Sequence, residues 1–337
     1  MKVTKVQPNL KTPIMKKVLL LLLSTFASTY LTAQDFHLEG DIRFDWASDS
    51  GFYGKILSLQ GKGSINDTFS YRFRHRFNKP IGNYYAFDAT DLAYIGIKAS
   101  DKLNFLLGKQ TFLQGGWEYN IAPVDSYVPS ILCADLPCYQ FALTSKYAFN
   151  EGKDELSFQV SNNPYSELGS NKYALSLAWD GHHGFFHSKY SINWFDAFND
   201  NKAFMFAFGN KFVFNKFSTY LDFISIGALY DGDPFMNSNT VLQMDYKFND
   251  KFNIFAKYSY DHNSGNDYPL ASSGTAFQRI AGGLEYFPIG DAIRLHALLI
   301  YNTGTWVLGT ETTHFSGVVF NVGITCKLKL VDKTKNN

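Results

Sequence analysis

Apolar and polar residues alternate along residues 36–46 and along many later segments of the chain. Every second position from Phe36 to Trp46 is hydrophobic or Gly, and the positions between them carry His, Glu, Asp or Arg. A period of two predicts a β-strand whose two faces meet different surroundings. The segments run to about ten residues and one face carries charges, which is typical of membrane-spanning strands with apolar side chains toward lipid and polar ones toward a wet lumen.

Sixteen segments share this period. They are residues 36–46, 53–63, 68–78, 91–99, 103–110, 138–149, 154–162, 172–180, 184–195, 202–214, 217–228, 239–248, 252–262, 276–287, 292–303 and 315–328. We predict an all-β chain folded as a transmembrane antiparallel β-barrel of about sixteen strands, and the same pattern also allows fourteen or eighteen. Aromatic residues make up 17% of the chain although the mean hydropathy is −0.17, which suits a barrel with aromatics on its lipid face.

The predicted connections alternate between short and long. The short ones are residues 66–67, 100–102, 150–153, 181–183, 215–216, 249–251 and 288–291. The long ones are residues 47–52, 79–90, 111–137, 163–171, 196–201, 229–238, 263–275 and 304–314. Outer-membrane barrels have this arrangement, with the short turns in the periplasm and the long loops outside the cell.

The third long connection, residues 111–137, is here called the third loop. It has three acidic residues and no Lys or Arg. Together with its aromatic residues, the acids form the predicted constriction set: Trp117, Glu118, Tyr119, Asp125, Tyr127 and Asp135. Long loops in compact folds are usually functional, so we expect this extracellular loop to fold into the lumen. The alternative is an exposed surface loop.

The N-terminus has the features of an export signal. Lys16 and Lys17 precede a short apolar run that leads to small residues around Ala33. We predict three parts: an N-terminal extension with a cleavable signal peptide at 1–33, the barrel at 34–330, and a polar tail at 331–337. Cleavage lowers the formal charge from +1 to −4, because residues 1–33 contain five lysines and no acid. A mildly acidic mature chain makes nucleic acid an unsuitable partner.

All six arginines fall on the polar face of predicted strands. With Lys327 they form a predicted pore-lining basic wall: Arg43, Arg72, Arg74, Arg76, Arg279, Arg294 and Lys327. The last strand closes against the first in a barrel, so these residues share one arc. An acidic loop facing this wall creates a transverse field that favours small polar solutes, with a bias toward anions. The alternative is that the arginines only pair with neighbouring acids, namely Glu39, Asp41, Asp45 and Glu285.

Other reactive residues give no sign of catalysis. Cys133 and Cys138 flank a short segment near the end of the third loop, where they can form a disulfide or remain free buried thiols. His183 and His187 have a spacing that suits a metal only on a helix, and this stretch is predicted as a turn followed by a strand. No phosphate-binding, serine-hydrolase or zinc-protease motif is present, so we predict neither enzyme activity nor a cofactor.

Several short motifs resemble the phosphate-selective porin O and P family, in the form found in Bacteroidetes. They are residues 72–80 (RFRHRFNKP), 108–110 (GKQ), 115–119 (GGWEY), Pro123, 137–141 (PCYQF), 282–288 (GGLEYFP) and 294–296 (RLH). The resemblance covers essentially the mature chain. It implies a sixteen-stranded, trimeric porin whose third loop forms the constriction.

The chain also departs from that family's pattern. Anion-selective members have lysine-rich mouths, whereas this mature chain is net acidic, so phosphate specificity does not follow from the resemblance. Outer-membrane proteins usually end on an aromatic residue that the barrel-assembly machinery reads, whereas this chain ends with Leu330 and a polar tail.

We predict an outer-membrane porin of a Gram-negative bacterium that admits small anions or polar solutes by passive diffusion. The expected partners are outer-membrane lipid and lipopolysaccharide, the barrel-assembly machinery, and two further copies of the chain in a homotrimer. One alternative is a substrate-specific channel that grips a ligand with the third-loop aromatics. The other is a non-conducting barrel with a structural or secretion role.

Overall fold

The computed structural model describes residues 35–79, 87–165, 172–196, 202–226, 233, 235–267 and 271–334. The predicted signal peptide at 1–33 lies outside the described residues, as do the last three residues of the predicted tail. Within the described part, no helix has the length and apolar character needed to cross a bilayer.

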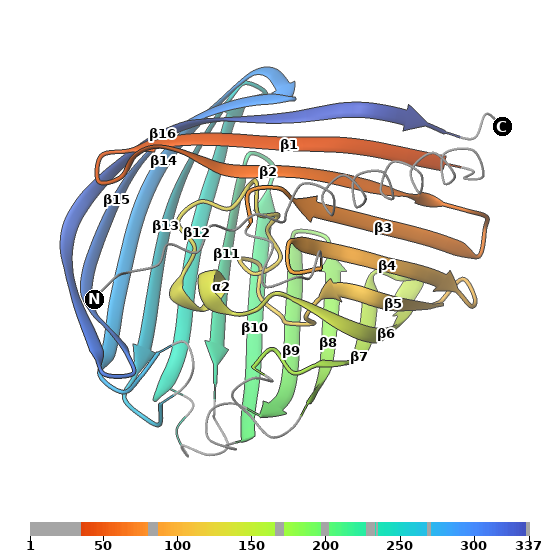
Figure 1. Cartoon of the computed structure of the whole chain (residues 1–337), viewed down its shortest axis with the longest axis horizontal. Coiled ribbons are helices and arrows are strands. Elements are labelled where there is room, and N and C mark those ends of the chain that lie inside the picture. Colours follow the sequence, from red (N-terminus) through yellow and green to blue (C-terminus); the bar gives the residue numbers. More distant parts are fainter. Residues whose placement is uncertain are drawn as a thin grey trace, which may run out of the picture.

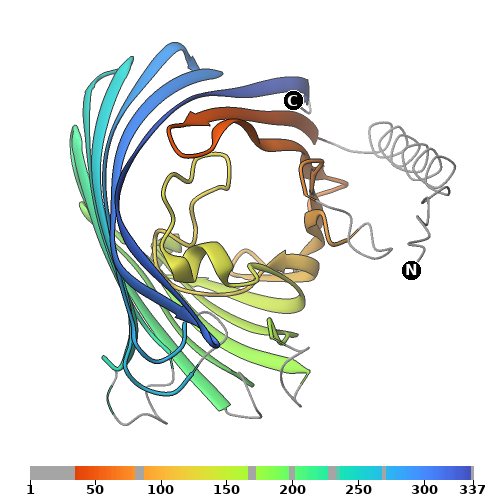
Figure 2. The same cartoon turned by 60° about the vertical axis from the view of Figure 1, so that its left-hand side comes forward.

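Sixteen antiparallel strands form one closed barrel, in which each strand pairs with its sequence neighbours and β16 pairs with β1 (Figures 1 and 2). The strands are β1 (Asp35–Ala47), β2 (Gly51–Ser64), β3 (Phe69–Arg76), β4 (Thr90–Lys98), β5 (Leu103–Thr111), β6 (Tyr139–Phe149), β7 (Asp154–Asn162), β8 (Tyr173–His183), β9 (Phe186–Asp196), β10 (Lys202–Phe214), β11 (Phe217–Ser225), β12 (Asn237–Asn249), β13 (Phe252–Asn263), β14 (Thr275–Asp291), β15 (Ile293–Leu308) and β16 (Glu311–Lys333). The predicted fold class and the count of sixteen are confirmed.

Two connections predicted to be long are short. The structure leaves only residues 48–50 between β1 and β2, and residues 309–310 between β15 and β16. Beyond the apolar part of these strands, the ladder continues through pairs such as Thr305 with His314 and Val307 with Thr312. β-Branched residues favour extended backbone, so these strands extend past the point where alternation with apolar residues ends.

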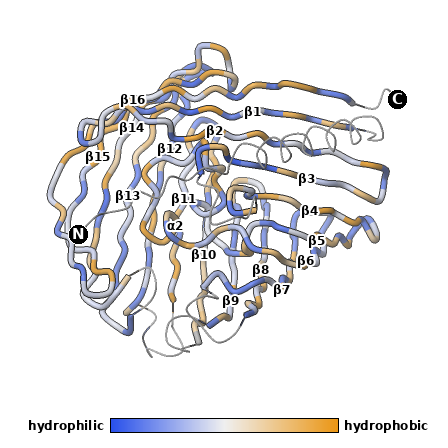
Figure 3. Tube along the Cα trace, in the orientation of Figure 1, coloured by the Kyte–Doolittle hydropathy of each residue, from blue (hydrophilic) through white to orange (hydrophobic). Residues whose placement is uncertain are grey.

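The two faces of the barrel wall differ as the alternation predicts (Figure 3). On β9, Ile192 and Trp194 are exposed, whereas Ser191 and Asn193 between them are buried. The exposed face is apolar and the buried face is polar, the reverse of a soluble protein. This distribution is that of a barrel whose outer surface meets lipid.

The third loop, which in the structure spans residues 112–138, contains the short helix α2 (Ile131–Asp135). An apolar cluster joins its two ends to β9 and β10; the cluster includes Phe112, Tyr119, Leu132, Leu136, Phe195 and Met205. Phe112, Phe195 and Met205 are fully buried. Burial of these side chains stabilises the base of the loop against this part of the wall.

Candidate functional site

The first half of the third loop is bound to β11 through one carboxylate. Asp222 accepts hydrogen bonds from the backbone N–H of Trp117 at 2.8 and 2.9 Å and from that of Glu118 at 2.8 Å. The backbone comes close to the wall at Gly116, which has a φ of 93°. Glycine adopts this conformation without strain, and a larger residue would not fit as well.

A buried ion pair holds the same part of the loop to β13. The carboxylate of Glu118 lies 2.5 Å from Nζ of Lys257, and each side chain is only 4% exposed. Glu118 also accepts hydrogen bonds from the backbone N–H and the hydroxyl of Ser130. The remaining acceptor capacity of the carboxylate is therefore used within the loop, as a buried charge requires.

Asp261, also on β13, binds the start of helix α2. Its carboxylate accepts hydrogen bonds from the backbone N–H groups of Ile131 at 3.1 Å and Leu132 at 3.4 Å. Ser130 caps the same helix through its side chain. Three separate contacts with β11 and β13 therefore fix the position of the third loop.

Tyr127 connects the loop to the strands that carry the arginines. Its hydroxyl donates a hydrogen bond to Glu285 at 2.9 Å, and its ring stacks on Phe255 with centroids 5.5 Å apart. The guanidinium groups of Arg43 and Arg294 lie 4.6 and 5.3 Å from the ring centroid. Burial is the main reason that the pKa of the Tyr127 phenol is raised, so the hydroxyl stays a proton donor.

Arg43 and Arg294 are neutralised by nearby carboxylates. Arg43 makes hydrogen bonds of 2.9 and 2.7 Å to the two oxygens of Asp45. Arg294 lies 2.9 Å from Asp125 and 3.5 Å from Glu285. These two arginines are therefore paired with acids, which was the alternative to a basic wall that favours anions.

Arg74 and Arg76 are in a different situation, because they share a single acid. Asp91 lies 3.1 Å from Nε of Arg74, 2.5 Å from Nε of Arg76 and 3.3 Å from Nζ of Lys79. Three cations around one buried carboxylate leave a local excess of positive charge. The ring of Tyr139 lies beside all three cations.

This cationic group borders a small cavity of about 150 Å³. Arg72, Arg74, Arg76 and Lys327 line it together with Asp91, Asp125, Glu39 and Asp41. Lys327 pairs with Asp125 at 2.7 Å. The third loop and the basic strands therefore meet at this cavity, with charges of both signs on its walls.

Arg279 faces a second cavity, of about 230 Å³, that Arg43, Tyr53 and Lys55 also line. Its guanidinium donates to the side-chain oxygen of Asn302 at 2.9 Å and to the carbonyl of Pro129. These two acceptors are neutral, so they satisfy its hydrogen bonds without cancelling its charge.

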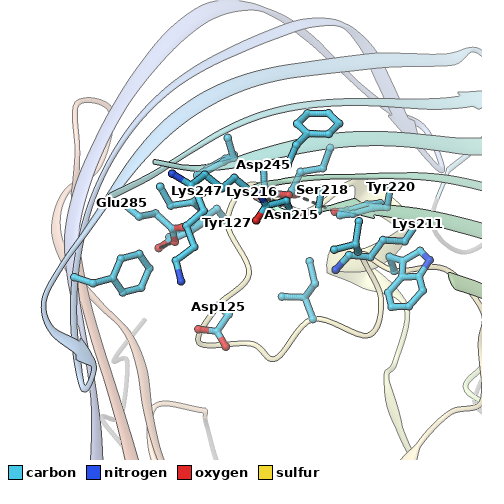
Figure 4. Close-up of a pocket in the computed structure, with 18 of the residues that line it drawn as sticks. Asp125, Tyr127, Lys211, Asn215, Lys216, Ser218, Tyr220, Asp245, Lys247 and Glu285 are labelled. Carbon is cyan, nitrogen blue, oxygen red and sulfur yellow. Dashed lines mark hydrogen bonds between the residues drawn. The ribbon is translucent and has the colours of Figure 1, made fainter. Parts of the chain in front are cut away.

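A larger cavity of about 530 Å³ is also lined by the third loop (Figure 4). Trp117, Asp125 and Tyr127 of the loop line it, with charged residues that the wall contributes: Lys211, Lys216, Lys247, Asp245 and Glu285. Trp117 is also close to Lys189 and Lys211, whose ammonium groups lie 5.0 and 5.2 Å from its ring. The mixed lining is suited to water and small polar solutes.

The remaining predicted residues of the loop have different surroundings. Tyr119 is buried in the apolar cluster, whereas Asp135 is exposed at the end of α2. Cys133 and Cys138 are free thiols, so the structure lacks the disulfide that was one of the two alternatives. Their sulfur atoms point toward different carbonyls, those of Glu118 and Leu136. Burial raises the pKa of the Cys133 thiol, which keeps it protonated and unreactive.

Four residues that position the loop or the arginines were not identified from the sequence: Asp91, Asp222, Lys257 and Asp261. Asp222, Lys257 and Asp261 occupy the polar face of a strand, and that position was the available signal. Asp91 has the same parity as the exposed Ile95, and it is buried beside a register shift at the start of β4, so alternation did not identify it. Asp222 and Lys257 bind residues more than 100 positions away in the chain, a pairing that only the closed barrel creates.

Within the described residues, no three His, Cys, Asp or Glu side chains converge as a metal site. His183 bonds to Asp154 at 2.9 Å and pairs in register with Phe186, not with His187.

Residues 33–206 match a family model described as phosphate-selective porin O and P. No curated protein matches the chain. Among solved structures, the barrel is similar to the outer membrane channel DcaP of Acinetobacter baumannii, with 13% identity, a TM-score of 0.59, and coverage of 87% of this chain and 97% of that one. It is also similar to an anion-selective porin from Comamonas acidovorans, with 9% identity, a TM-score of 0.59, and coverage of 87% and 99%. The trimer form of OmpT from Vibrio cholerae has 13% identity, a TM-score of 0.57, and coverage of 87% and 98%. At these identities the likeness concerns the fold alone.

Proposed function

This chain belongs to the phosphate-selective porin O and P family, and on that premise we propose that it is an outer-membrane porin whose pore favours small anions. Membership of the family and the closed barrel make it a passive-diffusion porin. The preference for anions goes beyond what family membership and the closed barrel establish.

The observation that carries this proposal is the cationic group around Asp91. Arg74, Arg76 and Lys79 share that one carboxylate, and Arg72 lines the same cavity. Positive potential in a narrow, partly desolvated passage raises the local concentration of anions and lowers that of cations. The net charge of the mature chain is negative, so the preference arises from this local arrangement.

The third loop supplies the narrow passage in this proposal. Its contacts with Asp222, Lys257 and Asp261 hold it against the polar faces of β11 and β13, while Asp125 reaches Arg294 and Lys327 on β15 and β16. The loop starts at β5, ends at β6 and is attached to strands between β11 and β16, so in this proposal it crosses the lumen and divides it into smaller openings. Solutes then pass close to the arginines.

The alternative of a ligand-gripping channel has less support. Tyr119 is buried in the apolar cluster, and Tyr127 is bound to Glu285 and stacked on Phe255. Both side chains are therefore engaged within the protein. Trp117 lines the larger cavity but is already in contact with two lysines.

The test is the reversal potential of the folded barrel in a planar bilayer across a KCl gradient. We expect the wild-type channel to prefer Cl⁻ over K⁺, and the variant Arg72→Gln/Arg74→Gln/Arg76→Gln to lose that preference. A matched control removes three exposed lysines from the connecting turns, Lys102→Gln/Lys153→Gln/Lys251→Gln, and should keep it.

The other possible results also decide between the proposal and its alternatives. A cation preference, or an anion preference that survives in the arginine variant, contradicts the proposal. Saturable block by phosphate would extend it to the solute in the family's name. A folded barrel that conducts no ions would support the structural or secretion alternative.

The same premise leads us to propose cleavage of residues 1–33 during export, assembly by the barrel-assembly machinery into a membrane with lipopolysaccharide, and a homotrimeric state. The solved trimer form of OmpT has a similar barrel, which supports the last point. The oligomeric state is measured by light scattering of the detergent-solubilised porin.

A further inference from the structure

The hairpin of β8 and β9 places two histidines directly opposite each other. A two-residue turn, Gly184 and Phe185, joins the strands, and His182 pairs in register with His187. Their Nδ1 atoms lie 2.6 Å apart, and the His182 side chain is 51% exposed. Both side chains lie on the same face, because paired residues of neighbouring strands do.

From this geometry we propose that His182 and His187 form a binding site for a late first-row divalent metal ion such as Zn²⁺, Ni²⁺ or Cu²⁺. Imidazole nitrogens are favoured ligands of these ions. Two nitrogens that each lie about 2.1 Å from a tetrahedral ion are about 3.4 Å apart, so the rings need to separate by less than about 1 Å. Water completes the coordination.

A neighbouring carboxylate has the position that such a site needs. Oδ1 of Asp180 lies 3.6 Å from Nε2 of His182, the ring nitrogen that is not in contact with His187. At this distance the two atoms are not hydrogen-bonded, and a ring shift of about 0.4 Å brings them within range. A carboxylate bonded to the second nitrogen of a metal-binding histidine stabilises the tautomer that leaves the ligating nitrogen free. His182 then offers the lone pair of Nδ1, and His187 accepts the metal at Nδ1 when its proton occupies Nε2.

The surrounding charges restrict which ions can bind. Lys189 is bonded to Asp180, and Lys211 pairs in register with His187 and lies near Trp117. These ammonium groups oppose ions such as Mg²⁺ and Ca²⁺, which bind mainly through charge to oxygen ligands. An ion that forms bonds to imidazole nitrogen can still be held.

The test is calorimetric titration of Zn²⁺ into the folded porin, purified without an affinity tag. We expect one ion per chain and at least about tenfold weaker binding in either His182→Gln or His187→Gln, because one imidazole is left. His183→Gln is the matched control, since His183 is next in sequence but is bonded to Asp154. It should bind Zn²⁺ as the wild type does.

A second measurement uses the wild-type protein alone. Zn²⁺ should protect His182 and His187 from modification by diethyl pyrocarbonate, as read by mass spectrometry, while His183 stays reactive. The proposal is wrong if the wild type does not bind Zn²⁺, or if both variants bind it as tightly as the wild type does. It is also wrong if His183→Gln loses as much affinity as they do. Because the readout is binding, its result is independent of whether the pore prefers anions.

Discussion

Glu118 and Lys257 illustrate how single residues control the position of the third loop. Both side chains are almost fully buried, and they come from the loop and from β13. A buried pair contributes little net stability relative to apolar residues of similar size, but removal of one partner leaves an uncompensated charge. The pair therefore acts mainly as a constraint on where the loop can lie.

We expect Lys257→Met to lower the free energy of unfolding by about 3–5 kcal/mol, because it strands the Glu118 carboxylate. Denaturant titration followed by tryptophan fluorescence measures this change. Lys251→Met, on an exposed turn, should change it little. The double variant Glu118→Gln/Lys257→Met should recover part of the loss, and a single variant as stable as the wild type would contradict this account.

Asp91 is the acid that limits the positive potential of its three cationic partners. We expect Asp91→Asn to increase the preference for Cl⁻ over K⁺, since the amide keeps a similar shape without the charge. The measurement is the reversal potential in a KCl gradient. Asp101→Asn, on an exposed turn beside Lys98, is the control and should leave the reversal potential unchanged. A shift toward cations in Asp91→Asn would be inconsistent with the proposed role.

At the scale of elements, the third loop and β10 approach each other closely because both carry a glycine. A Cβ at Gly209 of β10 would lie 2.7 Å from Cα of Gly116 and 2.8 Å from Oδ1 of Asp222. The first neighbour is backbone, and the second is a carboxylate oxygen held by the backbone N–H of Trp117. The loop therefore depends on a missing side chain in the wall as well as on its hydrogen bonds.

We expect Gly209→Ala to displace the loop and to destabilise the fold by about 1–3 kcal/mol, as overpacking does. In single-channel recordings the open-channel current should become noisier, because the bonds from Asp222 to the loop are weakened. Gly317→Ala provides the control, since an added Cβ there meets no atom within 4 Å. A quiet channel of wild-type conductance in Gly209→Ala would show that the loop is not displaced.

At the scale of the whole molecule, closure of β16 on β1 brings together residues that are far apart in sequence. Arg43 on β1, Arg74 on β3, Arg279 on β14 and Arg294 on β15 occupy one arc only because the sheet is closed. The potential in the pore is thus a property of the closed barrel and of the loop that faces this arc.

The anion preference should therefore depend on ionic strength. The screening length is about 10 Å in 0.1 M salt and about 3 Å in 1 M salt, so charges that line a passage act on ions over a shorter distance at high salt. We expect the ratio of Cl⁻ to K⁺ permeability to fall toward unity between these two concentrations. The Arg72→Gln/Arg74→Gln/Arg76→Gln variant should show little dependence, and an equal dependence in that variant would place the selectivity elsewhere.

Alternation along the chain was sufficient to predict an antiparallel barrel of about sixteen strands, their pairing order and the polar face on which all the arginines lie, although it also allowed fourteen or eighteen strands. These properties depend on neighbouring residues, because a period of two directly assigns each side chain to lipid or lumen. Strand ends were less predictable at β15 and β16, where polar β-branched residues extend the ladder.

Tertiary structure alone decided which charges cancel. Arg43 has its own carboxylate in Asp45, whereas Arg74 and Arg76 share Asp91 with Lys79, although all three arginines occupy equivalent positions in the pattern. It also decided that Lys257 meets Glu118 and that His182, not His183, faces His187. The physical reason is that Coulomb interactions and hydrogen bonds depend on distances of a few Å, which strand register and barrel closure set and sequence spacing does not.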